Sequence, residues 1–342
     1  MRAAVYRRFG GPDTVRVVNV PRPAVGPDDV LVRVHASTVS AADHRARSRD
    51  VPRGLWLLAA FGIGAFRPKR RVLGMDIAGV VAAVGRDVTR FVPGDEVIAM
   101  PGPAFGGHAE YARLRQDDAI ALKPRTMTFE DAVTLVFGGL TAHGFLRQAA
   151  PVPGASVLVN GASGAVGTAA VQLAAHAGAQ VTGVCSGRNR QLVASLGAER
   201  VIDYTTTEFT TDAATYDVIV DCVGNAPYER VRHLLRPGGA LLLVIADLPA
   251  ILRAPIRSRR TGHRITVDVG RPTADDLAFL VRLAEAGNYR PVRDRTFDLA
   301  DVAEAHRYVD TGHKRGNVVL RLPGGPEPTN TSIQHHSREA AS

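Results

Sequence analysis

The sequence predicts an α/β protein that combines a doubly wound parallel sheet with a second, mostly antiparallel β domain. Residues 1–126 contain short β segments between Gly and Pro turns, whereas residues 127–265 alternate strand and helix patterns. A chain of 342 residues is long enough to bury two such cores. Residues 266–322 are expected to return to the first domain, and residues 323–342 to form a tail.

The antiparallel part is predicted from apolar segments that succeed one another without long helices between them. Only one weak helical stretch interrupts them. The expected strands are 3–6, 30–34, 77–84, 96–99 and 111–114.

The parallel part begins where the apolar period becomes that of a helix. Thr128 with Asp131 three residues later is typical of a helix start, and a long helix is expected over 132–148. Apolar strands then alternate with helices, which predicts a parallel sheet covered on both faces. The expected strands are 157–159, 180–185, 201–204, 216–223 and 239–245, with a turn at 237–239 before the last.

Beyond this sheet, capping and apolar periodicity predict helices at 273–286 and 301–311, and a last strand at 317–322. Residues 323–342 lack any apolar period and are expected to be disordered.

A glycine-rich turn comes after the first parallel strand and opens a helix. It fits the pattern G-x-G-x-x-G with alanine first, so the turn is tight and a pyrophosphate can approach the backbone. A purely structural turn would show the same glycines. Because strand, helix and second strand occur in order, we predict a dinucleotide site here. Its residues are Ala162, Ser163, Gly164, Ala165, Val166 and Gly167.

The type of dinucleotide is predicted from the residues at the end of the second strand. An NAD site usually has an acidic residue about 20 positions after the glycines, to bind the ribose 2′-hydroxyl. No Asp or Glu occurs between Gly161 and Ala198. Ser186, Arg188 and Arg190 instead offer a hydroxyl and two guanidinium groups to a 2′-phosphate, which predicts NADPH. Arginines that are merely solvated at a helix start are the alternative.

The composition and the apolar segments limit the class of protein and its location. The chain is 45% hydrophobic and 22% charged, which is ordinary for a globular protein. Cys185 and Cys222 end predicted parallel strands, which favours thiols in a reducing compartment, and no signal peptide is apparent. A cytoplasmic location is therefore expected. The longest apolar stretch, 55–66, has 12 residues and is too short to span a bilayer.

The net charge of +9 comes from local arginine clusters in 45–53, 67–71 and 253–264. No nucleic-acid fold signature accompanies them, so we expect no nucleic-acid partner. The apolar stretch 55–66 beside RPKRR could lie on a membrane surface, but more often such a stretch closes an apolar substrate pocket. Membrane association is therefore not expected.

Several motifs together resemble those of a known family. They are GMDIAG at 74–79, PGDEV at 93–97, GGHAEY at 106–111, GLTA at 139–142, the glycine-rich turn, and SLGA at 195–198 before VIDY at 201–204. In these the chain is similar to the medium-chain dehydrogenase/reductase superfamily, within its zinc-independent quinone oxidoreductase and zeta-crystallin-like branch. The resemblance implies a GroES-like substrate domain, an NADPH-binding Rossmann domain, a cleft between them and a homodimer.

The same resemblance assigns further cofactor residues. It implies that Thr141, Val223 and Gly224 lie along the nicotinamide, with Ile245 on the nicotinamide loop. It also implies that Tyr204 joins Ser186 and Arg190 near the adenosine 2′-phosphate.

No zinc site is predicted. Ser40 stands where zinc-dependent relatives have a cysteine ligand, and Gly74-Met75-Asp76 replaces their Gly-His-Glu. The histidines, which include His35, His44, His108 and His143, have no metal-ligand spacing.

Without a Lewis acid, the chemistry needs an acceptor that is already electrophilic or a donor that polarises it. We therefore expect reduction of a small hydrophobic quinone or α,β-unsaturated carbonyl compound. Ser40, Asp43 and His44 are the candidates for substrate contact or proton delivery, because this segment lines the cleft in relatives. Alternatively, Ser40 bonds the backbone and Asp43 caps the following helix. A carbonyl reductase or alcohol dehydrogenase of the same fold and a non-catalytic NADPH- or RNA-binding protein are the other functions left open.

Overall fold

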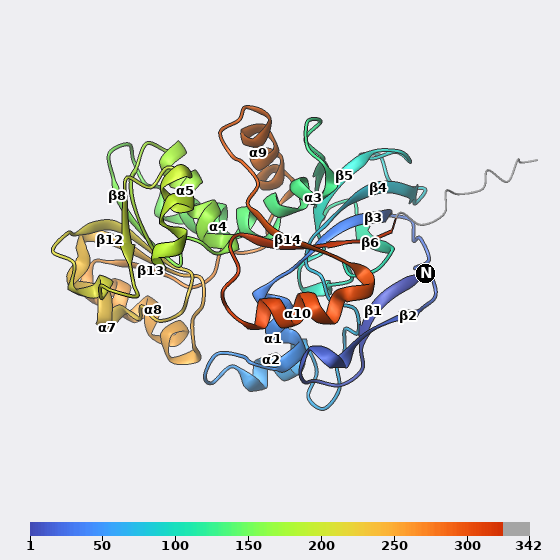
Figure 1. Ribbon diagram of the computed structural model, residues 1–342, viewed down its shortest axis with the longest axis horizontal. Coiled ribbons are helices and arrows are strands. Elements are labelled where there is room, and N and C mark those ends of the chain that lie inside the picture. The colour runs from blue at the N-terminus through green and yellow to red at the C-terminus, as the bar shows by residue number, and fades with distance from the viewer. Residues whose placement is uncertain (324–342) are drawn as a thin grey trace, which may run out of the picture.

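The computed structural model describes residues 1–323, in which two β-rich parts lie side by side (Figure 1). One part is a six-stranded parallel sheet with helices, and the other is a seven-stranded, mostly antiparallel sheet with a separate two-stranded hairpin. The predicted fold class is confirmed. The predicted disordered tail lies outside the described residues from 324 onward.

The parallel sheet has the strand order β10-β9-β8-β11-β12-β13, so the direction of winding reverses between β8 and β11. Ligands bind at such a point, outside the carboxyl ends of the strands. The strands are β8 (Ser156–Asn160), β9 (Gln180–Cys185), β10 (Arg200–Asp203), β11 (Tyr216–Asp221), β12 (Leu235–Leu243) and β13 (Arg264–Thr266).

Alternating side chains bury both faces of this sheet. Val157 and Val159 of β8 pack in one cluster with α4 and α5, whereas Leu158 packs on the opposite face with Tyr228 of α7. Fully burying such a side chain contributes about 1.5–3 kcal/mol. The helices of this part are α4 (Phe137–Ala149), α5 (Ala165–His176), α6 (Arg190–Ser195), α7 (Tyr228–Val231) and α8 (Leu248–Thr261).

The second sheet has the order β14-β15-β3-β4-β5-β7, and β6 also pairs with β3. Only the β14–β15 pair is parallel among its ladders. Its strands are β3 (Asp29–Val39), β4 (Ile77–Val84), β5 (Glu96–Met100), β6 (Tyr111–Arg115), β7 (Ala119–Leu122), β14 (Arg293–Asp298) and β15 (Asn317–Arg321). The hairpin is β1 (Arg2–Tyr6) with β2 (Val15–Asn19), and the helices are α1 (Ala41–Ser48), α2 (Trp56–Gly62) and α10 (Val302–Asp310).

Several elements differ from the expectations. The helix expected over 132–148 is divided into α3 (Phe129–Ala132), a 3₁₀ turn (Val133–Leu135) and α4, with Thr128 capping α3. The expected turn at 237–239 is a bulge inside β12, where pairing with β11 skips from Leu235 to Ala240. A sixth parallel strand, β13, comes after the basic stretch; with three residues it is too short to show a period. The helix expected over 273–286 is α9 (Ala274–Glu285).

The apolar stretch 55–66 contains the short helix α2, and most of the basic stretch belongs to α8. Among the described residues, no helix has the length and apolar character needed to cross a bilayer.

Candidate functional site

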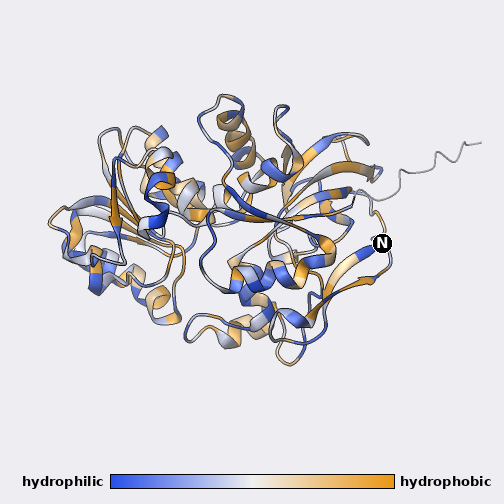
Figure 2. Cartoon of the chain, viewed as in Figure 1, coloured by the Kyte–Doolittle hydropathy of each residue, from blue (hydrophilic) through white to orange (hydrophobic). Residues whose placement is uncertain are grey.

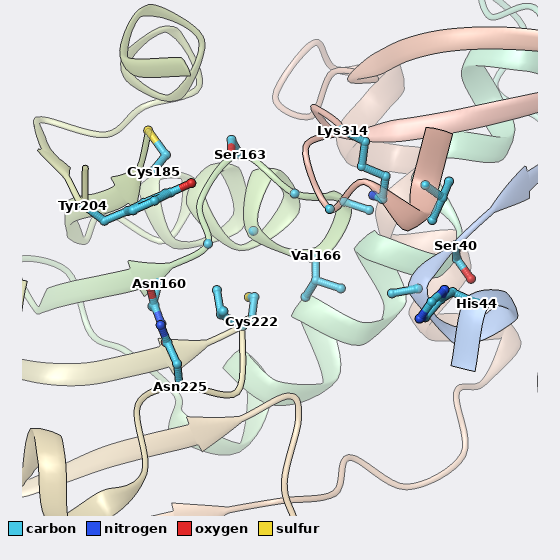
Figure 3. Close-up of a pocket in the computed structure, with 18 of the residues that line it drawn as sticks. Ser40, His44, Asn160, Ser163, Val166, Cys185, Tyr204, Cys222, Asn225 and Lys314 are labelled. Atoms are coloured by element: carbon cyan, nitrogen blue, oxygen red, sulfur yellow. The ribbon is translucent and has the colours of Figure 1, made fainter. Parts of the chain in front are cut away.

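A cavity of about 650 Å³ lies between the two parts, along the carboxyl ends of the parallel strands (Figure 3). Asn160, Cys185 and Cys222 line it where β8, β9 and β11 end. Ser40 and His44 line it from the other part. The volume is typical of a site for a small organic ligand.

The glycine-rich turn forms the middle of the cavity wall. A Cβ on Gly167 would lie 2.1 Å from the carbonyl oxygen of Gly161, so α5 approaches β8 this closely only because residue 167 is glycine. Gly164 is the N-cap of α5 and provides no side-chain cap. The first N–H groups of the helix are therefore available to an anion such as a pyrophosphate. Of the six residues predicted here, Ser163, Gly164, Ala165, Val166 and Gly167 line the cavity, and Ala162 is buried.

The residues predicted for the 2′-phosphate gather beyond one end of the cavity. Tyr204 lines the cavity and is 56% exposed. Ser186, Arg188 and Arg190 lie outside the lining in the segment between β9 and α6. The Arg188 guanidinium donates to the carbonyl oxygen of His313, 3.3 Å away, and is exposed.

Sequence reasoning missed an acid at this end. Asp203, the last residue of β10, lies so close to Gly187 that a Cβ there would be 2.3 Å from its Oδ2. Hydrogen bonds from Thr205 lower the pKa of Asp203, with smaller contributions from the Gly187 amide and the Arg190 charge. The NAD pattern places its acid at the end of the second strand, whereas this carboxylate comes from the third. The amide and hydroxyl of Thr205 both donate to Oδ1 of Asp203, so this carboxylate anchors the loop after β10.

A second missed acid, Asp221, holds the other strand end at the switch point. Its buried carboxylate accepts hydrogen bonds from the amides of Val223, Gly224 and Ala226, each at 3.0 Å. Asn160 also donates to it, at 2.9 Å. These bonds fix the loop after β11, so that Val223 lines the cavity.

The other residues assigned to the nicotinamide lie behind the cavity surface. Gly224 packs against Ile245, whose side chain would be 3.0 Å from a Cβ at position 224, and neither residue lines the cavity. The Thr141 hydroxyl donates to the carbonyl oxygen of Phe137, 2.7 Å away in the same helix, and Phe137 takes the lining position instead.

Of the three catalytic candidates, Asp43 is corrected by the structure. Ser40 is the N-cap of α1, and its hydroxyl donates to Asp43 at 2.6 Å. Asp43 is fully buried, also accepts from the Gly74 amide at 2.8 Å, and does not line the cavity. The capping alternative therefore holds: Asp43 orients Ser40 and the start of α1, because an acid at the third helical position closes a capping box.

His44 lines the cavity and has a partner that sequence reasoning missed. Its Nδ1 is 2.7 Å from Oδ1 of Asp310 at the end of α10. The buried guanidinium of Arg47 donates to both oxygens of the same carboxylate, at 2.6 and 2.7 Å. A carboxylate held in this way accepts a hydrogen bond from Nδ1–H and orients the imidazole. Its other ring nitrogen, Nε2, lies 3.5 Å from Oδ2 of Asp50, which is outside the cavity lining.

Lys314 is a further lining residue that was not predicted. Its Nζ donates to the Gly316 carbonyl oxygen at 2.6 Å, and burial lowers its pKa to about 8, partly opposed by the charge of Asp294. The Gly316 amide donates to the Ser163 carbonyl oxygen at 2.7 Å. The loop before β15 thus holds a cation beside the glycine-rich turn, although no motif singled out the lysine.

The apolar stretch 55–66, whose role as the closure of an apolar substrate pocket stays a prediction, lies away from the lining of this cavity. None of its residues lines that cavity, and Phe61 and Phe66 are 77% and 93% exposed. Metal chemistry has no evident ligand set: within residues 1–323, no group of three or more His, Cys, Asp or Glu residues could hold an ion. Zinc independence remains a prediction.

Two family models match the chain: an alcohol dehydrogenase GroES-like domain over residues 26–161 and a zinc-binding dehydrogenase over residues 196–320. The chloroplastic quinone oxidoreductase QR1 of Triphysaria versicolor is 30% identical, with 94% of this chain and 98% of the relative aligned. The chloroplastic NADPH-dependent alkenal/one oxidoreductase of Arabidopsis thaliana is 31% identical, with 94% and 79% aligned.

Among solved structures, the quinone oxidoreductase from Coxiella burnetii superposes with a TM-score of 0.85 at 28% identity, covering 94% of this chain and 99% of the other. The sequence motifs, the two-part architecture and the relatives all indicate the same family. The chain therefore belongs to the medium-chain dehydrogenase/reductase superfamily, in its quinone oxidoreductase branch, and is an oxidoreductase that uses a nicotinamide cofactor.

Proposed function

We propose that the protein is a zinc-independent, NADPH-dependent oxidoreductase that reduces quinones or α,β-unsaturated carbonyl compounds by direct hydride transfer. The course of the cavity carries this proposal. Tyr204 lies at one end, the uncapped start of α5 in the middle, and Ser40 with His44 at the other end (Figure 3). An extended dinucleotide would lie along this course with its nicotinamide toward His44. The names of the quinone oxidoreductase and alkenal/one oxidoreductase relatives support the acceptor class.

The residues of this chain orient the cofactor and the acceptor and supply a proton. NADPH, when bound, supplies the hydride that an electrophilic carbon or a quinone accepts. His44 donates an imidazole proton to the acceptor and regains one from solvent, so that NADPH and one proton are consumed and NADP⁺ and the reduced acceptor are formed. Asp310 holds the imidazole in position for this transfer. Ser40, committed to Asp43, orients the cavity wall rather than donating.

The acceptor class is tested by following NADPH absorbance with quinones, enones and aldehydes, and NADP⁺ reduction with simple alcohols. We expect turnover with quinones or enones, unchanged after treatment with a chelator, and well under one zinc per chain by elemental analysis. Ready oxidation of secondary alcohols without turnover of quinones or enones would replace the proposal with the alcohol dehydrogenase alternative. No turnover with any acceptor would favour the non-catalytic alternative.

Cofactor preference is expected to depend on Arg188 and Arg190. Each charged hydrogen bond contributes about 1.5–3 kcal/mol, so replacing both residues with alanine should weaken NADPH binding at least about tenfold and leave NADH binding little changed. Dissociation constants for both cofactors, measured by fluorescence titration, test this. Arg7→Ala with Arg8→Ala, two exposed arginines on the other part, is the matched control. Equal constants for NADPH and NADH in the parent protein would contradict the assignment.

NADPH affinity is also expected to fall as the pH rises through about 8, where Lys314 loses its proton in the free protein. The charged form, present below that pH, attracts the pyrophosphate, and one charged contact predicts a change of up to about tenfold between pH 7 and pH 9. Lys314→Met should bind NADPH weakly at both pH values.

Lys69→Met is the control for this titration, because the Lys69 ammonium also donates to a backbone carbonyl oxygen, that of Phe61 at 2.6 Å, away from the cavity. It should keep the pH dependence of the parent. A Lys314→Met protein that keeps the same dependence would show that another group causes it.

A further inference from the structure

A patch of large apolar side chains is exposed on and after α2. Single exposed apolar residues are ordinary, but five within eleven consecutive residues form a patch that usually has a partner. They are Trp56, Leu57, Leu58, Phe61 and Phe66, and each is at least 55% exposed. Figure 2 shows the hydrophobic colouring of α2 at the lower edge of the molecule.

A second helix with exposed apolar residues contacts the same segment. The Leu248 amide at the start of α8 donates to the Arg53 carbonyl oxygen just before α2, at 3.0 Å. Leu252 and Ile256, one turn apart on α8, are 62% and 54% exposed. We call these seven apolar residues, together with the cations of residues 51–71 and 248–264, the basic apolar face.

The excess positive charge of the protein lies in these two segments. They contain ten of the 42 Lys and Arg residues and no Asp or Glu, whereas the rest of the chain has 32 cationic and 33 acidic residues. Lys69 lies directly against α2, because its Nζ donates to the Phe61 carbonyl oxygen. Arg67, Arg70 and Arg71 beside it are exposed. Apolar and cationic groups are therefore adjacent on this face.

Three other roles for the face are disfavoured. The face does not serve the cavity, because no residue of α2 or α8 lines it. A symmetric contact with a second copy would bring like charges together, because among the described residues only Arg257 of the cations on this face has an acidic partner, Glu229 at 2.7 Å. Nucleic acid would match the charge, but four of the seven apolar residues, Leu57, Leu58, Leu252 and Ile256, have no π face for base stacking.

We propose that the basic apolar face docks the protein on the surface of a bilayer that contains anionic lipid. The large apolar side chains of α2 enter the interface between headgroups and acyl chains, and the surrounding cations contact the lipid phosphates and carboxylates. The helix lies on the membrane and does not cross it. This proposal does not depend on the reaction, because the face and the cavity share no residue.

The test uses Trp56, the only tryptophan in the chain, as its own reporter. The full-length protein is mixed with vesicles of phosphatidylcholine containing about 30% phosphatidylserine. We expect the Trp56 emission to shift to shorter wavelength, the protein to float with the vesicles, and both effects to weaken with added salt. Vesicles of phosphatidylcholine alone should bind much less protein.

Two variants separate the contributions of the apolar and charged groups. Phe61→Ser with Phe66→Ser should reduce flotation at least about tenfold, since two aromatic side chains no longer enter the interface. Arg67→Gln with Arg70→Gln should reduce it at least about fivefold. Val92→Ser with Val152→Ser and Arg7→Gln with Arg8→Gln make matched changes at exposed positions elsewhere and should bind like the parent. Unchanged NADPH turnover in each variant confirms that it is folded.

Three results would overturn the proposal. One is that vesicles change neither the Trp56 emission spectrum nor the flotation of the protein. Another is a blue shift that depends on protein concentration without vesicles and accompanies dimer formation in sedimentation, which would assign the face to a second copy. The third is binding to RNA or DNA that the Phe61→Ser, Phe66→Ser protein retains, in the absence of vesicle binding.

Discussion

Replacing His44 with glutamine is expected to lower kcat for quinone or enone reduction about hundredfold, the typical contribution of a positioned general acid. His44 lines the cavity, and the carboxylate of Asp310 holds its Nδ1 at 2.7 Å. Glutamine keeps the polarity of the side chain but cannot transfer a proton. The KM for NADPH should change little, because the glycine-rich turn and Lys314 are untouched.

The measurement is steady-state kinetics at saturating NADPH, with the solvent deuterium isotope effect recorded for the parent and the variant. The matched control is His143→Gln, which removes another histidine paired with an acid, Asp276 at 3.3 Å, outside the cavity lining. It should retain the kcat of the parent. If kcat of the His44→Gln protein also stayed near that of the parent, the proton would come from solvent instead.

Replacing Asp221 with alanine is expected to lower the free energy of unfolding of the parallel-sheet part by at least about 3 kcal/mol. The change leaves three backbone amides without their acceptor and removes one of the two hydrogen bonds that Asn160 Nδ2 donates, and each unsatisfied buried donor costs about 1–3 kcal/mol. The loop that carries Val223 would also move, so NADPH binding should weaken. Denaturant melts and NADPH titration measure the two effects.

Asp217→Ala is the control on the same strand. Asp217 accepts a hydrogen bond from the Ser156 amide and pairs with Arg236. Its side chain is 37% exposed, so water can take the place of the carboxylate. The loss of unfolding free energy should therefore be smaller. The loss of unfolding free energy in Asp221→Asn should lie between those of Asp221→Ala and Asp217→Ala, because the amide keeps one acceptor oxygen. An Asp221→Ala protein that melts like the parent would contradict this account of the switch point.

The two-part α/β architecture was predictable from local patterns. Strand and helix periods, the turn from Ala162 to Gly167 and the spacing to the second strand are set within a few tens of residues, where backbone sterics and apolar alternation act directly. The expected strands at 180–185 and 77–84 agree with β9 and β4 to the residue. Short elements such as β13 escaped prediction, because three residues carry no period.

The partners of the site residues were decided by the tertiary structure. His44 meets Asp310 across 266 positions, and Asn160 meets Asp221 across 61, so no local pattern could pair them. Likewise, the sequence showed Ser40 and Asp43 three residues apart but not whether their side chains point into the cavity or close a cap. The sequence by itself therefore determined the fold class and the glycine-rich turn, whose causes are local. Only the packing of distant segments decided which side chains face the cavity and which, as on α2, face solvent.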